Sequence, residues 1–290
     1  MKRRGAVALL GLMIAGGLFC ARSIGGQAGA LASVVNVEVT YVANEGFLLS
    51  GGGKKVLVDA LFRDGVRGYA VAPADMRSRL EAAQSPFDGV SLILVTHAHS
   101  DHFDAQAVGA HLMGNSAAAL VAVPDVTDQL KAEFKDYAYV SSRVHTVFPG
   151  RTGRTKHDIN GITVEVLRAP HGRAQHAAYL ITLGGKKFLH LGDSDGGAAD
   201  FAPLHLERDD IDVAFLPDWY LLYPEWPEVV RKHIRPKRIV AMHVAIDNNP
   251  DPELREHLKK FGGHAGLARK IQAEFPGTIV ALVPGARFRF

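Results

Sequence analysis

Cysteine is nearly missing from this sequence, and its scarcity narrows the chemistry available to the chain. The chain has 290 residues and one cysteine, Cys20, close to the N-terminus. If the N-terminal segment is removed, the remaining chain has no thiol, which excludes disulfides and cysteine-ligated metal sites. No internal repeat or low-complexity segment follows residue 31. Hydrophobic residues make up 47% of the chain, which is enough apolar material for a large core.

The first thirty residues have the layout of an export signal. Lys2, Arg3 and Arg4 precede an apolar run over residues 6–19, and small residues follow up to Ala30. This order predicts a signal peptide over residues 1–30 and a periplasmic or secreted mature domain over residues 31–290. The apolar run is shorter than the roughly 20 residues of a membrane-spanning helix. The alternatives are an uncleaved N-terminal membrane anchor and a lipid anchor on Cys20.

The chain also lacks a strong excess of charge once that segment is set aside. The whole chain carries 33 basic and 30 acidic residues, for a net charge of +3. Residues 1–30 contain four of the basic residues and no acidic one, so residues 31–290 carry 29 basic against 30 acidic residues, or −1. The basic character therefore belongs to the signal, and we expect no nucleic-acid partner. The sequence indicates no oligomeric state.

The hydrophobic pattern predicts an α/β fold. Strands open the chain, and strands then alternate with helices without a Gly/Pro/Ser-rich linker. This order predicts one domain in which two β-sheets pack together with helices outside. Strands are expected at residues 35–42, 46–49, 55–58, 91–95, 120–123, 162–167, 177–183, 187–191, 213–216, 238–242 and 278–282, and helices at 105–113, 126–134, 225–233 and 265–274.

A dense group of metal-binding residue types follows the predicted strand at residues 91–95. His97 and His99 are two residues apart in an extended segment, so their side chains point the same way and can reach one cation. Asp101 and His102 are adjacent where the chain must turn toward the next helix, and they can reach a second cation. Imidazole and carboxylate groups suit Zn²⁺, and also Mn²⁺ or Fe.

The segment from His97 to His102 resembles the H-x-H-x-D-H motif of the metallo-β-lactamase superfamily. The resemblance extends over the mature chain, because further segments occur in the family's order. These are Asn44-Glu45-Gly46-Phe47, Val56-Leu57-Val58-Asp59, Arg168-Ala169-Pro170-His171, His190-Leu191-Gly192-Asp193-Ser194 and Ala241-Met242-His243. It implies a four-layer αββα sandwich with mixed sheets. The motifs are most similar to those of the ascorbate-phosphate lactonase-like and N-acyl-phosphatidylethanolamine phospholipase D-like branch.

The resemblance also implies a ligand set for two metal ions. Metal one would take His97, His99 and His171, metal two would take Asp101, His102 and His243, and Asp193 would bridge both. His176 is the alternative to His171 as the third ligand of metal one. Asp59 is expected near the site. His190 is expected to be a core residue or a partner of a ligand.

Such a centre implies hydrolysis. Two divalent cations, most favourably Zn²⁺ with Mn²⁺ or Fe as alternatives, would hold a bridging hydroxide that attacks an ester, lactone or phosphodiester bond. Asp101 and Asp193 are the expected catalytic carboxylates. The positive centre suits a small-molecule or lipid-like substrate that is anionic. The alternatives are a non-catalytic metal-binding member of the fold and a di-iron oxidoreductase.

Two further segments carry weaker hints. Residues 218–226 contain both tryptophans, and they either line the site or pack in the core. The basic segment at residues 150–156 either contacts an anion or forms a solvated turn.

Overall fold

Two seven-stranded sheets form the centre of the fold in the computed structural model, which describes residues 36–150 and 153–290. The predicted signal peptide, residues 1–30, lies outside the described residues. The first sheet has the order β14-β1-β2-β3-β4-β5-β6 and the second β13-β12-β11-β10-β9-β8-β7. The strands are β1 (Glu38–Ala43), β2 (Gly46–Gly51), β3 (Lys54–Val58), β4 (Leu92–Val95), β5 (Ala119–Ala122), β6 (Val144–Thr146), β7 (Arg154–Ile159), β8 (Ile162–Arg168), β9 (Ala177–Leu183), β10 (Lys186–His190), β11 (Val213–Pro217), β12 (Ile239–Met242), β13 (Ile279–Val280) and β14 (Arg287–Arg289).

The two sheets share one pattern of strand directions. From β14 to β3 the neighbouring strands are antiparallel, and from β3 to β6 they are parallel. The second sheet is antiparallel from β7 to β10 and parallel from β10 to β13. Both sheets are therefore mixed, and each has a block of parallel strands whose carboxyl ends lie at one edge.

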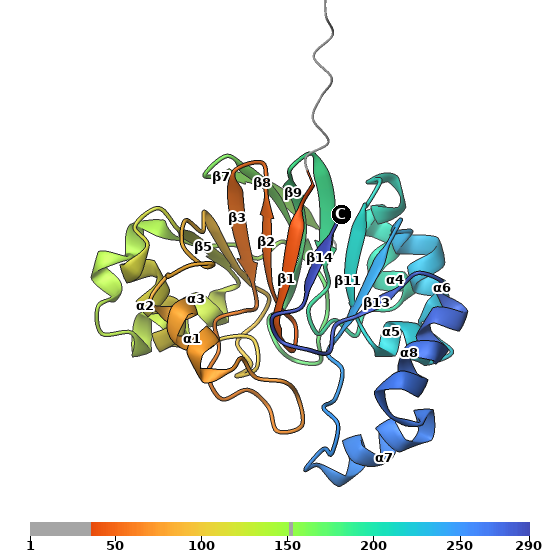
Figure 1. The fold of residues 1–290 in the computed structure, drawn as a ribbon. Helices are drawn as coiled ribbons and strands as arrows, with labels where there is room; N and C mark the ends of the chain where they lie inside the picture. The colour runs from red at the N-terminus through yellow and green to blue at the C-terminus, as the bar shows by residue number, and fades with distance from the viewer. Residues whose placement is uncertain (1–35, 151–152) are drawn as a thin grey trace, which may run out of the picture. The chain divides into compact units, whose positions relative to one another are not determined.

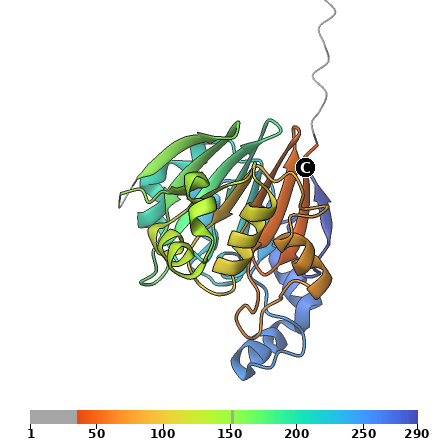
Figure 2. The same ribbon diagram turned by 90° about the vertical axis from the view of Figure 1, so that its left-hand side faces the viewer.

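Helices cover the outer faces of both sheets. Helices α1 to α3 lie against the first sheet, whereas α4 to α6 and α8 lie beside the second (Figures 1 and 2). Their bounds are α1 (Ala74–Glu81), α2 (Ala105–Gly114), α3 (Pro124–Glu133), α4 (Ala198–Phe201), α5 (Trp219–Leu222), α6 (Pro227–Val229), α7 (Pro252–Phe261) and α8 (Gly263–Glu274), with a π-helical turn at Val230–Ile234 after α6. The predicted α/β architecture of two mixed sheets covered by helices is confirmed.

Side chains alternate between two cores along the central strands of the second sheet. In β10 and β11, Phe188 and Phe215 belong to the core between the sheets, and Leu189 and Ala214 belong to the core under the helices. Phe215 meets Phe47 of the first sheet with ring centroids 4.5 Å apart. Strands buried on both faces read as continuous apolar runs, which is why they were predicted closely.

The elements missing from the prediction are short or polar. Strand β7 is half-exposed and has the polar sequence RTKHDI, so it lacks the apolar alternation of a strand. Helix α7 begins after Asp251, whose side chain accepts from two backbone amides, with Pro252 in its first turn. That cap was a usable signal in the sequence. The helix predicted at residues 225–233 is only a short α-turn and a π-turn. Within residues 36–150 and 153–290, no helix is long and apolar enough to cross a membrane.

Candidate metal centre

Polar residues from both sheets collect at the carboxyl ends of the strands. Asp59 follows β3, and His97 comes shortly after β4, which is parallel to β3. In the second sheet, Asp193 follows β10 and His243 follows β12, and both of these strands are parallel to β11. His171 follows β8, which runs in the same direction as β10 because each is antiparallel to β9. The topology thus brings together residues that are far apart in the sequence.

The His97–His102 segment forms a tight turn between β4 and α2. His97 and His102 are fully buried, and Asp101 is nearly so. The rings of His97 and His99 lie side by side, with centroids 4.3 Å apart, as expected for residues two apart. The backbone amides of His102 and Phe103 both donate to the His99 carbonyl, at 3.1 and 3.0 Å. This turn points His97 and His99 toward one position and Asp101 and His102 toward another.

The seven predicted ligand residues fall into two groups that share Asp193. The first contains His97, His99, His171 and Asp193, and the second contains Asp101, His102, Asp193 and His243. Within each group, one ligand atom of every side chain lies within 4.8 Å of the others. The structure therefore brings all seven side chains together, and their binding of metal stays a prediction.

Asp193 is oriented so that its two oxygens face different groups. Its Oδ2 atom lies 3.7 Å from His97 Nε2 and 3.8 Å from His171 Nε2. Its Oδ1 atom lies 3.3 Å from Nε2 of both His102 and His243. One carboxylate is thus placed to give one oxygen to each of two cations.

The separations within the groups fit divalent cations. Ligand atoms about 2.0–2.1 Å from a tetrahedral metal are about 3.3 Å from one another, close to the 3.3–3.8 Å found around Asp193. His97 Nε2, His102 Nε2 and Asp193 Oδ1 are buried without a hydrogen-bond partner in the part of the chain that the structure describes. Buried polar atoms normally have a partner. A cation would supply it, and imidazole and carboxylate donors suit Zn²⁺, Mn²⁺ or Fe.

The electrostatics of the site favour the ligand forms of His97 and Asp193, whereas the neighbouring Asp193 carboxylate raises the pKa of His102 and His243. Burial, together with the neighbouring His102, holds the pKa of the His97 imidazole well below its ordinary value. Burial alone would raise the pKa of Asp193, but His243 and His102 beside it hold that pKa well below its ordinary value. His97 is therefore neutral and Asp193 ionised, as metal binding requires.

Asp59 forms hydrogen bonds with Thr96 and His102 and so fixes the orientation of the His97–His102 segment. Its Oδ2 accepts from Thr96 Oγ1 at 2.7 Å and pairs with His102 Nδ1 at 2.9 Å, and its Oδ1 accepts from the Thr96 amide at 2.8 Å. The bond to Nδ1 leaves the Nε2 lone pair of His102 free for a metal. Asp59 adopts φ +44°, a conformation unusual for a non-glycine residue. The sequence placed Asp59 near the site, and the structure shows what it contacts.

Other residues support the ligands in the same way. Asn44 Nδ2 donates to Asp101 Oδ2 at 3.0 Å. Asp195 Oδ2 accepts from the Gly172 amide at 2.8 Å, which ties the loop after β10 to the loop that carries His171. His190 pairs with the Glu45 carbonyl through Nε2 and accepts from the Gly192 amide through Nδ1, so both of its ring nitrogens are occupied and it is a structural residue.

His171, not His176, belongs to the first group. His171 Nε2 faces Asp193, whereas His176 Nδ1 lies 3.0 Å from the Ala169 carbonyl. His176 is buried against Gly192, where an added Cβ would lie 2.5 Å from His176 Nε2. No other residue fits in the place of this glycine without moving the ring. We therefore retain His171 as the predicted third ligand of metal one.

Single alanine variants separate the two histidines. We expect His171→Ala to lose the ion of the first group and to lower any hydrolytic rate, because that group then keeps three side chains. His176→Ala should keep both ions, since its ring lies beside His97, with centroids 5.2 Å apart, but belongs to neither group of ligand atoms. Metal content after gel filtration measures this directly. Loss of an ion only in His176→Ala would reverse the assignment.

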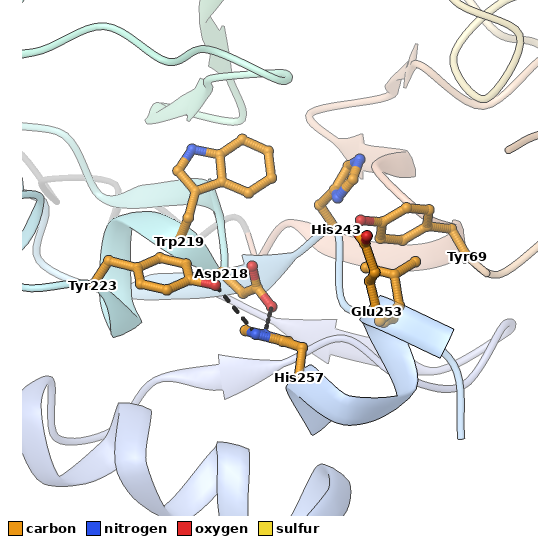
Figure 3. Close-up of a pocket in the computed structure, with 9 residues that line it drawn as sticks. Tyr69, Asp218, Trp219, Tyr223, His243, Glu253 and His257 are labelled. Atoms are coloured by element: carbon orange, nitrogen blue, oxygen red, sulfur yellow. Dashed lines mark hydrogen bonds and ion pairs between the residues drawn. The ribbon is translucent and has the colours of Figure 1, made fainter. Parts of the chain in front are cut away.

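Two buried acids near the centre were not singled out from the sequence. Glu45 is fully buried, with one carboxylate oxygen 3.9 Å from His102 Nδ1. Asp218, at the end of β11, is 7% exposed and borders a cavity that also reaches His243 (Figure 3). Residues 218–226 were considered as lining of the site because of their tryptophans, but nothing in that segment reveals the spatial neighbours of the Asp218 carboxylate.

The structure shows what contacts are made by residues of the two other segments considered from the sequence, 218–226 and 150–156. In the 218–226 segment, Trp219 lines the cavity beside His243, whereas Trp226 packs on Tyr220 with ring centroids 4.9 Å apart. Trp219 therefore lines the cavity near the site, and Trp226 packs against other side chains. In the basic segment, Arg154 begins β7 and pairs with Glu165 and Asp209, so it is not available to a substrate anion. Residues 151–152 lie outside the described part.

Comparison with known proteins identifies the family. Residues 54–250 match the family described as the beta-lactamase superfamily domain. A UPF0173 metal-dependent hydrolase from Thermococcus kodakarensis is 27% identical over 255 residues, which cover 85% of this chain and all of that relative. A second relative of the same description, from Thermus thermophilus, is 25% identical over 240 residues, which cover 79% of this chain and 91% of the relative.

Solved structures agree on the fold. The metallo-beta-lactamase fold protein YhfI from Bacillus subtilis superposes with a TM-score of 0.58 at 16% identity, covering 88% of this chain and all of that one. A diiron β-hydroxylase from Streptomyces venezuelae has a TM-score of 0.57 at 14% identity over 88% of this chain and 54% of its own. At these identities the likeness shows the fold alone. With the family match over most of its length, the chain belongs to the β-lactamase superfamily.

Proposed function

We propose that this chain, a metal-dependent hydrolase of the β-lactamase superfamily, binds two divalent cations, most favourably Zn²⁺, and hydrolyses an ester, lactone or phosphodiester bond. The observation that carries the proposal is the orientation of Asp193, whose Oδ2 faces His97 and His171 and whose Oδ1 faces His102 and His243. A carboxylate that presents one oxygen to each of two groups of histidines is placed to bridge two cations.

The charge of the ligand set supports hydrolysis of an anionic or oxyanion-forming substrate. Bound divalent cations lower the pKa of a coordinated water to about 7 and polarise a carbonyl or phosphoryl group. Asp101 and Asp193 are the two carboxylates among the seven predicted ligands, so they and a bound hydroxide would offset three of the four positive charges of two such ions. The centre keeps a net positive charge, which favours the negative charge that develops in the transition state. We assign the catalytic role to these two aspartates on this ground.

The remaining residues of the site act as positioning residues. Asp59 holds the ring of His102, and Asn44 holds the carboxylate of Asp101. Hydrogen bonds of this kind fix the direction in which a ligand presents its lone pair. Both Asn44 and Asp59 adopt positive φ, so the loops after β1 and β3 are bent where they meet the ligand segment.

We also propose that the mature protein is exported and acts on a small-molecule or lipid-like substrate outside the cytoplasm. Support comes from the basic and apolar segments of residues 1–30 and from the near-neutral charge of the rest. Zinc as the resident metal, the periplasmic or secreted location and the absence of a nucleic-acid partner are parts of this proposal. Sequencing the N-terminus of the protein purified from its native host tests the cleavage.

Removal and return of metal tests the proposed function. Wild-type protein is assayed against phosphodiester, lactone, thioester and β-lactam substrates before and after exhaustive chelation. We expect at least one ester, lactone or phosphodiester to be hydrolysed, the activity to be lost with the metal, and Zn²⁺ or Mn²⁺ to restore it. The reason is that the seven predicted ligands are histidines and aspartates, so the nucleophile would be a water activated by the bound metal.

The other outcomes point to different functions. Hydrolysis that continues in fully metal-free protein would contradict the proposal. Two bound ions without turnover of any substrate would favour a non-catalytic metal-binding protein. Bound iron with oxygen consumption would favour a di-iron oxidoreductase.

A further inference from the structure

A cavity of about 250 Å³ opens beside the second group of metal-binding residues. Three aromatic side chains and two carboxylates contribute to its wall, together with one histidine from each of two segments (Figure 3). The lining consists of Tyr69, Asp218, Trp219, Tyr223, His243, Ala245, Glu253, Leu254 and His257. No lysine or arginine is among these described lining residues, so the cavity combines π-faces with negative charge.

Two of the aromatic rings connect the cavity to the centre. The Tyr69 ring lies 4.1 Å from the His243 ring, and the Trp219 ring lies 5.1 Å from it, both measured between centroids. Trp219 Nε1 donates to the Ser194 carbonyl at 3.1 Å, which fixes that ring next to the residue after Asp193. A substrate group in the cavity would thus be separated from the second cation by little more than the His243 imidazole.

Asp218 is a buried carboxylate without a close cation. It is 7% exposed, and burial raises the pKa of its carboxyl to about 7, while the nearby His243 acts to lower that pKa. The basic side-chain atom that approaches it within 4.0 Å among the described residues is His257 Nε2. His257 Nδ1 is occupied by the Tyr223 hydroxyl at 3.1 Å, and burial and the nearby Lys260 lower the pKa of His257. His257 is therefore neutral and does not compensate Asp218.

We propose that this cavity binds a positively charged ammonium group of the substrate. Ammonium groups are attracted to the faces of Trp and Tyr rings, most strongly where water is excluded. A buried carboxylate needs a cation or several hydrogen bonds to offset its lost hydration, and among the described residues no basic side-chain atom lies closer to Asp218 than His257 Nε2, at 4.0 Å. Glu253, which is exposed and also lines the cavity, adds a second negative charge that attracts an ammonium group.

The inference rests on the proposed function and narrows the substrate class. The electrophilic group binds at the positive centre, and the ammonium group lies in the negative aromatic cavity on the other side of His243. Esters and phosphodiesters of amino alcohols or quaternary-ammonium alcohols have both features. A volume of about 250 Å³ suits such a compact headgroup rather than a long acyl chain.

Ligand binding to the metal-loaded full chain tests the cavity without requiring turnover. Tetramethylammonium chloride is titrated calorimetrically at constant ionic strength against its uncharged analogue 3,3-dimethyl-1-butanol. We expect saturable binding of the ammonium ion only, weakened about tenfold or more by Asp218→Asn and by Trp219→Leu, since a desolvated cation–π contact alone is worth about this much. Glu225→Gln, an exposed acid of the same segment outside the cavity, is the matched control.

Turnover then shows whether the two proposals hold together. We expect a choline ester to have at least about tenfold higher kcat/KM than its isosteric 3,3-dimethylbutyl ester, and this preference to vanish in Asp218→Asn. Equal binding of the charged and uncharged ligands, or unchanged ammonium binding in both folded variants, would overturn the inference. Metal-dependent hydrolysis of uncharged esters without ammonium binding overturns the cavity proposal alone. Ammonium binding without hydrolysis supports the cavity and contradicts the function.

Discussion

Replacing Asp193 by alanine should cost the protein both metal ions and essentially all hydrolytic activity. Both groups use this carboxylate, through Oδ2 in the first and Oδ1 in the second. We expect a rate loss beyond the roughly 10–100-fold that follows removal of a residue that only supports a ligand. Metal analysis after gel filtration, together with the rate on the best substrate, measures the effect.

A neighbouring aspartate provides the control for this experiment. Asp195 is exposed, and its Oδ2 accepts from the Gly172 amide instead of facing the centre. Asp195→Asn should therefore keep two ions per chain and most of the rate, because the asparagine carbonyl oxygen can still accept from the Gly172 amide. If Asp193→Ala retained both ions and its activity, the shared-carboxylate account would be wrong.

Replacing Asp59 by asparagine should weaken metal binding without removing any ligand. The amide has one acceptor oxygen, so either the Thr96 amide, or the Thr96 hydroxyl together with His102 Nδ1, loses its acceptor in a fully buried place. We expect about 10–100-fold weaker affinity for the second ion, as is typical for partners of metal-binding histidines. We also expect a loss of roughly 1–3 kcal/mol in the free energy of unfolding of the metal-free protein, because a buried donor is left unpaired.

Competition with a chromogenic chelator gives the affinity, and thermal unfolding of the metal-free protein gives the stability. Asp128→Asn is the matched substitution on the surface, because Asp128 is exposed on α3 and distant in sequence from the site. It should change neither quantity. Wild-type affinity in Asp59→Asn would mean that His102 keeps its orientation without this hydrogen bond.

The buried strands could be predicted from sequence because their residues are apolar on both faces. Strand β9 (Ala177–Leu183) has the predicted bounds, and β4 (Leu92–Val95) begins one residue later than predicted. Strand β14 (Arg287–Arg289) was not expected, because three residues at an exposed edge carry too little apolar pattern. Its conformation depends on pairing with β1, which lies almost 250 residues earlier in the sequence.

The candidate ligands could be predicted because the motif and the strand ends are local features. His97 to His102 form one short segment, and Asp193 and His243 each come shortly after an apolar strand. The surroundings of the site could not be predicted in this way. Nothing near Asp218 in the sequence indicates that His257, on a helix about 40 residues later, lies 4.0 Å from it.

The central claim is that the seven converging side chains bind two ions through one shared aspartate. The most direct test is the amount of metal bound per chain of residues 31–290, measured by plasma mass spectrometry after gel filtration. The account predicts two ions per wild-type chain. A wild-type protein that retains only one ion, or none, after saturation with Zn²⁺, Mn²⁺ or Fe²⁺ would contradict it.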